Sequence, residues 1–302
     1  MRIAFVMPAY NEEDFLEESL DSVLPYMERI VVVNDGSKDS TGALAEAYAA
    51  RYPDKVEVIH HPKNRGIGGA VTTGIKHLLL RDDVDAIGIV ASDNQCEPLM
   101  IPRFREVLEQ NPEIDIAKGS RFLHPESLDA IPRFRYYGNI GVSAVMRLIL
   151  GYWGMSDVLH GYLLARTHVF REMDLGRVAD GYDLEITMMT EFRRLRCKVG
   201  LLPSPSHYGV EKSKIVAHKE IPRFLARMGH ILGRRLVSGE LTDRISPALL
   251  ATGNVPLAVL AMWLTSPDVR VFPGPAGPIA PRNQTPRERK KARSVAGSAK
   301  PN

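Results

Sequence analysis

The chain has 302 residues, of which 44% are hydrophobic and 25% are charged, so it can bury the core of one large α/β domain or of two small domains. Its net charge of +3 is unevenly distributed, because residues 268–302 contain eight Lys or Arg and two acids, a net +6 that leaves −3 for residues 1–267. The basic composition therefore indicates a basic tail on a near-neutral body and gives no support to a nucleic-acid-binding body.

Short β-rich segments alternate with helical segments over the first two-thirds of the chain. The predicted strands are Ile3–Met7, Arg29–Asn34, Val56–His60, Ala86–Ala91 and Ile114–Lys118. The predicted helices are Glu12–Met27, Ser40–Arg51, Ile67–Leu80 and Pro98–Gln110, with Ser40 as an N-cap and Pro98 at a helix start. This alternation predicts an α/β fold with a mainly parallel sheet and helices on both faces.

Polar residues and glycines follow each of the five predicted strands. Ligands of open α/β sheets bind at the carboxyl ends of the strands, so these segments are expected to meet in one crevice. Packing alone does not readily explain polar groups at five consecutive strand ends. The segments are Pro8–Glu12, Asn34–Ser37, Asn64–Gly66, Ser92–Gln95 and Gly119–Arg121.

Asp35 and the glycine-rich segment Asn64–Ala70 each allow two interpretations. A carboxylate at a strand end can accept hydrogen bonds from the N–H edge of a uracil or guanine ring, but Asp35-Gly36-Ser37 also fits an Asx-type turn. The glycines of Asn64–Ala70 precede a helix whose N-terminus would favour an anion. Glycines at a helix start can equally serve packing alone.

Asp93 and Gln95 follow an apolar strand, and alternate residues of an extended segment point the same way. Their two oxygens, completed by diphosphate oxygens, would suit Mg²⁺ or Mn²⁺. Such a metal neutralises the charge that builds on a leaving diphosphate. The alternative is a polar loop that leads into the helix at Pro98.

Several charged residues further along the chain are candidates for handling an acceptor. Arg121, Arg133 and Arg135 have the guanidinium fork that matches phosphate, although a single arginine is more often a solvated surface residue. Asp157 and Glu185 are candidate carboxylates, and Glu185 also fits an exposed acid on a helix. The nine histidines show no spacing typical of a zinc site.

The pattern changes after about residue 206. Residues 221–237 predict a basic amphipathic helix, and residues 248–265 form an uncharged stretch at the lower length limit of a membrane span, interrupted by Gly253, Asn254 and Pro256. We therefore expect a catalytic domain over residues 1–210, amphipathic and apolar helices over 211–266, and a basic disordered tail over 267–302. The apolar stripe of the amphipathic helix comprises Ile221, Phe224, Leu225, Met228, Leu232 and Leu236.

The order and spacing of these motifs resemble the family-2 glycosyltransferases, especially the branch of dolichol-phosphate mannose synthases and polyprenyl-phosphate glycosyltransferases. The resemblance runs from about Arg2 to Lys214 and includes Asp157 with Gly161-Tyr162, and Lys212-Ser213-Lys214. It implies a GT-A fold, a UDP- or GDP-sugar donor, a divalent metal (Mg²⁺ or Mn²⁺) and transfer with inversion.

The resemblance also implies roles for individual positions. The expected nucleotide-sugar ligands are Pro8, Tyr10, Glu12, Asp35, Asn64, Gly66 and Asp93. The expected metal ligands are Asp93 and Gln95, and the expected acceptor-phosphate ligands are Arg121, Arg135 and Asn139. The expected catalytic residues are Asp93, Asp157 and Arg121; Asp157 would be the general base for a hydroxyl acceptor, whereas a phosphate acceptor is already anionic and needs little help.

One position departs from the family pattern. Ala91 replaces the first acid of the metal motif, and Asn94 replaces its usual small fourth residue. The loss of one carboxylate bears on metal binding, and therefore on activity. It bears less on the fold.

The leading hypothesis is transfer to a polyprenyl (dolichyl or undecaprenyl) phosphate at the cytoplasmic membrane face. The basic helix would lie in the interface, or else pack on the catalytic domain or on a second copy of the chain. The two cysteines and an N-terminus that enters a strand-like segment at once predict a cytoplasmic chain without a secretory signal. The alternatives are a glycan, protein or modified-nucleobase acceptor and an inactive nucleotide-sugar-binding scaffold; a nucleic-acid partner is not expected, because the basic tail lacks stacking aromatics.

Overall fold

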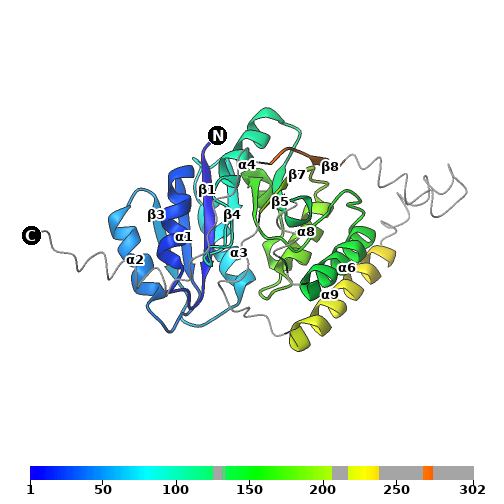
Figure 1. Cartoon of the computed structure of the whole chain (residues 1–302), viewed down its shortest axis with the longest axis horizontal. Helices are drawn as coiled ribbons and strands as arrows, with labels where there is room; N and C mark the ends of the chain where they lie inside the picture. The colour runs from blue at the N-terminus through cyan, green and yellow to red at the C-terminus, as the bar shows by residue number, and fades with distance from the viewer. Residues whose placement is uncertain (125–130, 132, 206–216, 238–267, 275–302) are drawn as a thin grey trace, which may run out of the picture.

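The computed structural model describes residues 1–124, 131, 133–205, 217–237 and 268–274. In this part of the chain, eight strands form one sheet in the order β3-β2-β1-β4-β6-β5-β7-β8 (Figure 1). β6 runs antiparallel to its neighbours β4 and β5, and the other pairs are parallel, which confirms a mixed, mainly parallel sheet. The strands are β1 (Ile3–Ala9), β2 (Arg29–Asn34), β3 (Val56–His60), β4 (Ala86–Ile89), β5 (Ile116–Ser120), β6 (Leu163–Arg166), β7 (Val199–Pro203) and β8 (Val269–Val271).

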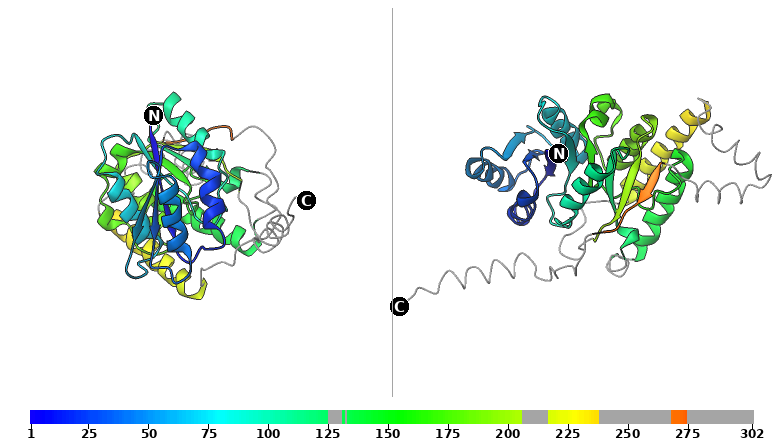
Figure 2. Two further views of the ribbon diagram at one scale, coloured as in Figure 1. Left: turned by 90° about the vertical axis from the view of Figure 1, so that its left-hand side faces the viewer. Right: turned by 90° about the horizontal axis from the view of Figure 1, so that it is seen from above.

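Helices cover both faces of the sheet, as the end-on view in Figure 2 shows. The helices are α1 (Leu16–Val23), α2 (Thr41–Arg51), α3 (Ile67–Leu78), α4 (Met100–Gln110), α6 (Arg133–Leu150), α7 (Thr167–Glu172), α8 (Leu184–Arg194) and α9 (Ala217–Val237). Alternate residues of one strand enter different cores: Phe5 of β1 packs with α1, α2 and α4, whereas Val6 packs with α3 and α6 to α9. Burial on both sides explains why these strands are continuous apolar runs.

The predicted elements are present, with shifts at their ends. β4 ends at Ile89 rather than Ala91, α1 begins only at Leu16, and α4 begins at Met100, two residues after Pro98. Ser40 occupies the N-cap position of α2, but its side chain makes no capping bond. Asp39 takes that role, because its Oδ1 accepts hydrogen bonds from both the main-chain N (3.0 Å) and the Oγ1 (2.6 Å) of Thr41.

The prediction of a disordered tail over residues 267–302 is wrong for residues 268–274. β8 pairs in parallel with β7, and an ion pair of 3.3 Å joins Arg193 to Asp268 at the start of β8. Two β-branched residues, Val269 and Val271, suit an added edge strand. The uncharged stretch 248–265 and the rest of the tail lie outside the described residues.

α9 packs beside α6, as Figures 1 and 2 both show. Met228 and Ile231 are each 6% exposed and belong to the core, and Phe224 packs against it. The predicted stripe therefore faces the catalytic body at these positions, which is the packing alternative rather than burial in lipid. Leu225, assigned to the same stripe, points outward and is 62% exposed. No helix among the described residues is long and apolar enough to cross a membrane.

Candidate active site

The loops that follow β1 and β2 are hydrogen-bonded to each other. Asn11 donates its main-chain N–H to Ser37 Oγ at 3.0 Å and accepts from the N–H of Lys38 at 2.8 Å. Glu12, which is buried, donates its N–H to Thr41 Oγ1 at 2.7 Å. Asn11 has φ of 53°, a left-handed conformation that asparagine tolerates. These contacts hold the segment Pro8–Glu12 against the start of α2.

The Asp35 carboxylate organises the loop that follows β3. It is 2% exposed, and it accepts hydrogen bonds from the main-chain N–H groups of Arg65 and Gly66, both at 2.9 Å. His61 Nδ1 lies 2.6 Å from Asp35 Oδ1. The sequence prediction missed His61, although a histidine directly after a predicted strand was the available signal.

The glycines at the start of α3 serve close packing. Gly68 and Gly69 donate their N–H groups to Asp180 O at 2.8 and 3.3 Å, and a Cβ on Gly68 would lie 1.8 Å from Ala179 O. Gly66 has φ of 90°, where a side chain would be strained. These N–H groups at the N-terminus of α3 therefore already have a main-chain acceptor, which favours the packing interpretation of the glycines over anion binding.

A cavity of about 620 Å³ opens at the carboxyl ends of β1, β2 and β4; we call it the outer cavity. Every residue expected to bind the nucleotide sugar lines it. These residues are Pro8, Tyr10, Glu12, Asp35, Asn64, Gly66 and Asp93. Gln95 joins them, and Gly181 and Tyr182 close the cavity from the segment before α8. The predicted convergence of distant strand ends on one crevice is thus present.

Asp93 and Gln95 reach this cavity through a turn and not through an extended segment. Asn94 adopts a left-handed conformation with φ of 59°, and the Gln95 N–H donates to Asp93 Oδ1 at 3.0 Å. The turn is anchored because Ser92 Oγ donates to Pro8 O at 2.8 Å. The predicted alternation of side chains along an extended segment is wrong, because the strand has already ended at Ile89, but both residues still line the same space.

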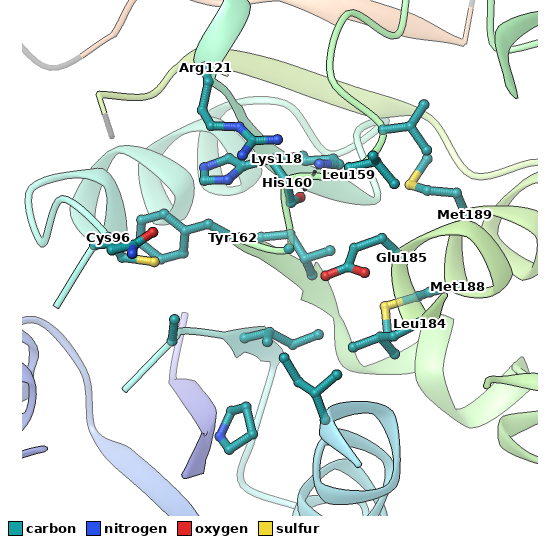
Figure 3. A pocket seen from close by; sticks show the side chains of 18 of the residues that line it. Cys96, Lys118, Arg121, Leu159, His160, Tyr162, Leu184, Glu185, Met188 and Met189 are labelled. Atoms are coloured by element: carbon teal, nitrogen blue, oxygen red, sulfur yellow. Dashed lines mark hydrogen bonds between the residues drawn. The ribbon is translucent and has the colours of Figure 1, made fainter. Parts of the chain in front are cut away.

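An inner cavity of about 220 Å³ continues from the outer one, and the two share Pro8, Ile67, Ala91, Asp93 and Gln95. Its wall is mostly apolar, with contributions from β4, β6 and α8. The polar groups in Figure 3 that face this wall come from β5, from the segments that follow β5 and precede β6, and from α8. They are Lys118, Arg121, His160 and Glu185.

Arg121 and Asp157 form a two-pronged ion pair at the edge of the inner cavity. Arg121 Nε donates to Asp157 Oδ2 at 2.7 Å, and Nη2 donates to Oδ1 at 2.9 Å. Asp157 is fully buried. Burial alone would raise the pKa of Asp157, but the Arg121 guanidinium outweighs it and holds that pKa well below its usual range. Asp157 is therefore ionised at neutral pH.

Lys118 and Glu185 are the other titratable groups of the inner cavity. Lys118 is 1% exposed, its Nζ donates to His160 O, and burial lowers the pKa of its ammonium to about 8. Glu185 lies in the first turn of α8 and is partly buried rather than exposed; burial raises its pKa to about 7. The sequence prediction missed Lys118 and His160, and a lysine within an apolar strand was the available signal for Lys118.

Of the remaining predicted acceptor ligands, the structure describes only the side chain of Asn139. Asn139 lies on α6 and lines neither of them. The side chain of Arg135 and the segment Lys212-Ser213-Lys214 lie outside the described residues. The described residues contain no cluster of three or more His, Cys, Asp or Glu that could hold a metal ion by themselves. Ala91 lines both cavities at the position of the replaced acid, next to Asp93 and Gln95.

Residues 4–173 match the model of the family described as glycosyl transferase family 2. Curated relatives include the dolichol-phosphate mannosyltransferase of Pyrococcus furiosus, with 28% identity over 65% of this chain and 54% of the relative. The polyprenol monophosphomannose synthase of Mycolicibacterium smegmatis shares 30% identity over 62% of this chain and 70% of the relative. The undecaprenyl-phosphate mannosyltransferase of Micrococcus luteus shares 28% identity over 67% of this chain and 82% of the relative. The chain thus spans little more than half of the archaeal relative and most of the two bacterial ones.

Among solved structures, glucosyl-3-phosphoglycerate synthase from Mycobacterium tuberculosis has the same architecture. Its complex with phosphoglyceric acid superimposes with a TM-score of 0.56 at 20% identity, covering 78% of this chain and 79% of that one. Its complex with Mn²⁺ and UDP-glucose superimposes with a TM-score of 0.55 at 21% identity, covering 76% of this chain and 79% of that one. At this identity the likeness establishes the GT-A fold alone. The match over residues 4–173, more than half of the sequence, shows that the chain belongs to glycosyl transferase family 2 and is a glycosyltransferase.

Proposed function

We propose that the chain transfers a sugar from a UDP- or GDP-sugar to a polyprenyl phosphate. The observation that carries this proposal is the junction of two cavities at Asp93 and Gln95. A nucleoside diphosphate sugar has three parts in a row, and the cavities offer a place for each in the same order. The names of the curated relatives, which are polyprenyl- or dolichol-phosphate mannosyltransferases, support the acceptor class.

In this arrangement the nucleoside occupies the outer cavity. Asp35 is a buried acid of that cavity, and its carboxylate already accepts hydrogen bonds from the N–H groups of Arg65 and Gly66. A carboxylate fixed by three partners needs no reordering when it accepts a further bond from a ring N–H. Tyr10 lines the same cavity and offers an aromatic face to the base.

The diphosphate lies at the junction of the cavities, where Asp93 and Gln95 would hold Mg²⁺ or Mn²⁺. One carboxylate and one amide oxygen fit a metal that takes its other ligands from phosphate and water. When bound, the metal neutralises the charge of the departing diphosphate. The Asp93-Asn94-Gln95 turn, which Ser92 ties to β1, holds Asp93 Oδ1 by a hydrogen bond from the Gln95 main-chain N–H and brings both residues to the same space.

The sugar enters the inner cavity. That cavity combines an apolar wall with a few polar groups, which is typical of a site that orients a small ligand. The Glu185 carboxylate can accept from sugar hydroxyls, and the Lys118 ammonium can donate to them. Figure 3 shows Glu185 extending from α8 into the space that Lys118 and His160 face from the other side.

The acceptor phosphate approaches Arg121. The Arg121 guanidinium is held by Asp157, and Arg121 lines the inner cavity, where the attacking oxygen of the acceptor phosphate must meet the sugar. The low pKa of Asp157 makes it a weak proton acceptor, and a phosphate needs no base. We therefore assign Asp157 the task of fixing Arg121, and we keep the general-base role only for the alternative of a hydroxyl acceptor.

A polyprenyl acceptor requires contact with a lipid surface, which we place peripherally at the cytoplasmic face. The outer faces of α6 and α9 offer exposed apolar side chains: Tyr137 is 69% exposed, Val145 43% and Leu225 62%. Arg223 and Arg234 are exposed on α9, which suits anionic head groups. The buried stripe of α9 takes no part in this contact.

The test is a transfer assay with the full chain. Undecaprenyl phosphate in vesicles is incubated with UDP-glucose, UDP-GlcNAc, GDP-mannose or UDP-galactose, with Mn²⁺, Mg²⁺ or EDTA, and the lipid is analysed by mass spectrometry. We expect one donor to yield a glycosyl undecaprenyl phosphate by mass, and NMR of this product should show that the anomeric configuration of the donor is inverted. Nucleotide binding without transfer to this or to glycan, protein and nucleobase acceptors would favour the scaffold alternative instead.

A further inference from the structure

The segment Ala179–Asp183 forms a wall of the donor site. The Asp180 carbonyl accepts the N–H groups of Gly68 and Gly69 at the start of α3. Gly181 and Tyr182 line the outer cavity, and Leu184 and Glu185, which follow directly, line the inner one. The position of this segment therefore sets the shape of both cavities.

An ion pair joins this wall to α9. Arg227 Nε donates to Asp183 Oδ2 at 2.8 Å. The Asp183 side chain is 13% exposed and Arg227 is 40% exposed, so the carboxylate is the buried partner. Asp183 is the residue before α8 and lies next to the cavity-lining Tyr182 and Leu184.

We propose that Arg227 is a positioning residue of the donor site, so that α9 belongs functionally to the catalytic unit and not to a separate appendage. α9 lies beyond residues 4–173, which the family model matches, and no role for it follows from that match. The identity of the ligand in this inference rests on the proposed function. The physical cause does not, because a mostly buried carboxylate that loses its cation favours conformations in which it reaches water.

Removal of Arg227 therefore lets Ala179–Asp183 move outward and enlarges both cavities. Donor affinity falls, whereas the chemical step is little affected once the donor is bound. A partly exposed ion pair supports a modest effect, and we expect a rise of about three- to fivefold in the donor KM with kcat nearly unchanged.

The experiment is a double-mutant cycle with Arg227→Ala, Asp183→Asn and the double variant. The single Arg227→Ala variant leaves a buried charge unpaired, whereas the double variant leaves a neutral amide. We therefore expect the double variant to recover part of the donor affinity that Arg227→Ala loses. Arg171→Ala is the matched control, because Arg171 on α7 makes an ion pair with Asp82, which follows α3, and lines neither cavity.

Amide hydrogen exchange over residues 179–185 is measured in parallel without any ligand. We expect faster exchange in Arg227→Ala than in wild type or Arg171→Ala. The proposal is overturned if donor KM and exchange are both unchanged, or if Arg227→Ala lowers Tm alone, since a purely structural ion pair would do only that. If the wild-type chain transfers no sugar, the proposed function fails, yet the exchange experiment still decides the role of Arg227.

Discussion

Asp157 accepts two hydrogen bonds from the Arg121 guanidinium, Nε to Oδ2 at 2.7 Å and Nη2 to Oδ1 at 2.9 Å, and a third from the Arg121 main-chain N–H at 3.2 Å. The two residues are 36 positions apart in the chain, and each looked like an independent candidate for the acceptor. Their pairing makes them one unit: the acid orients the guanidinium, and the guanidinium keeps the acid ionised.

Asp157→Asn keeps the size of the side chain but removes its charge and one acceptor of the fork. We expect kcat/KM for the acceptor to fall about 10- to 100-fold, the effect of losing a charge-assisted bond of about 1.5–3 kcal/mol. The thermal shift caused by UDP or GDP should not change, because Asp157 does not line the outer cavity. Arg121→Lys, which keeps the charge but loses the fork, should resemble Asp157→Asn. Full activity of Asp157→Asn would remove the unit from the acceptor site.

Asp35→Ala removes the partner of two main-chain N–H groups and of His61. We expect it to abolish the rise in Tm that nucleotides cause, because the loop after β3 loses its anchor and the nucleoside its acid. Tm without ligand should also fall, since buried donors left unsatisfied cost about 1–3 kcal/mol each. An unchanged nucleotide shift would exclude Asp35 from binding.

Ala91→Asp restores the acid that the family usually has in the metal motif. Ala91 lines both cavities, together with Asp93 and Gln95, so a carboxylate there would add a hard oxygen ligand. We expect about a tenfold lower Mn²⁺ concentration for half-maximal nucleotide-induced thermal shift, and loss of metal dependence in Asp93→Asn. Equal metal requirements of wild type and Ala91→Asp would mean that no metal lies at this position.

Glu185 should make stability depend on pH. Burial raises its pKa to about 7, so between its usual value and pH 7 the folded chain keeps a proton that the unfolded chain has lost. Its contribution to stability is therefore present at low pH and is lost as pH rises towards 7. We expect Tm to fall between pH 5 and 8 by about 2–4 °C more in wild type than in Glu185→Gln. Parallel profiles of the two proteins would contradict a Glu185 that keeps its proton in the folded chain up to about pH 7.

Gly68→Ala tests the packing of α3 against Ala179–Asp183. The added Cβ would lie 1.8 Å from Ala179 O, so the main chain must move, and we expect a loss of about 1–3 kcal/mol in the free energy of unfolding. Gly138→Ala on α6 is the control, because its Cβ would meet nothing within 4 Å. That change should be neutral or stabilise the helix by up to about 1 kcal/mol. Equal denaturation midpoints of the two variants would argue against the close contact.

Strand ends were predictable because they depend on local patterns. β2 and β3 have the predicted limits, and the rule that ligands meet the carboxyl ends of parallel strands was enough to bring Asp35 and Asp93 to one cavity. β6 is a four-residue strand inserted antiparallel between β4 and β5, and no local pattern marks such an insertion. Its approach to the sheet carries His160 into the site, so that residue was missed.

Other parts of the site depend on contacts between distant segments. Whether Lys118 points into a core or into a cavity depends on which elements pack against β5. The position of Lys118 within the strand sequence does not decide between the two. The apolar stripe of α9 indicated that this helix packs against another surface, but it did not show which surface. Met228 and Ile231 pack into the core that also contains residues of α6. The ion pair of Arg227 with Asp183 joins two segments that are 44 residues apart, so the sequence of neither segment could predict it.

The most direct test of this account is a structure of the chain with Mn²⁺ and the intact nucleotide sugar that the transfer assay selects. We predict the base against Asp35 in the outer cavity, the diphosphate at Asp93 and Gln95, and the sugar beside Glu185 and Lys118 in the inner cavity. A donor found in any other place, or one whose sugar points away from Lys118 into solvent, would contradict the account.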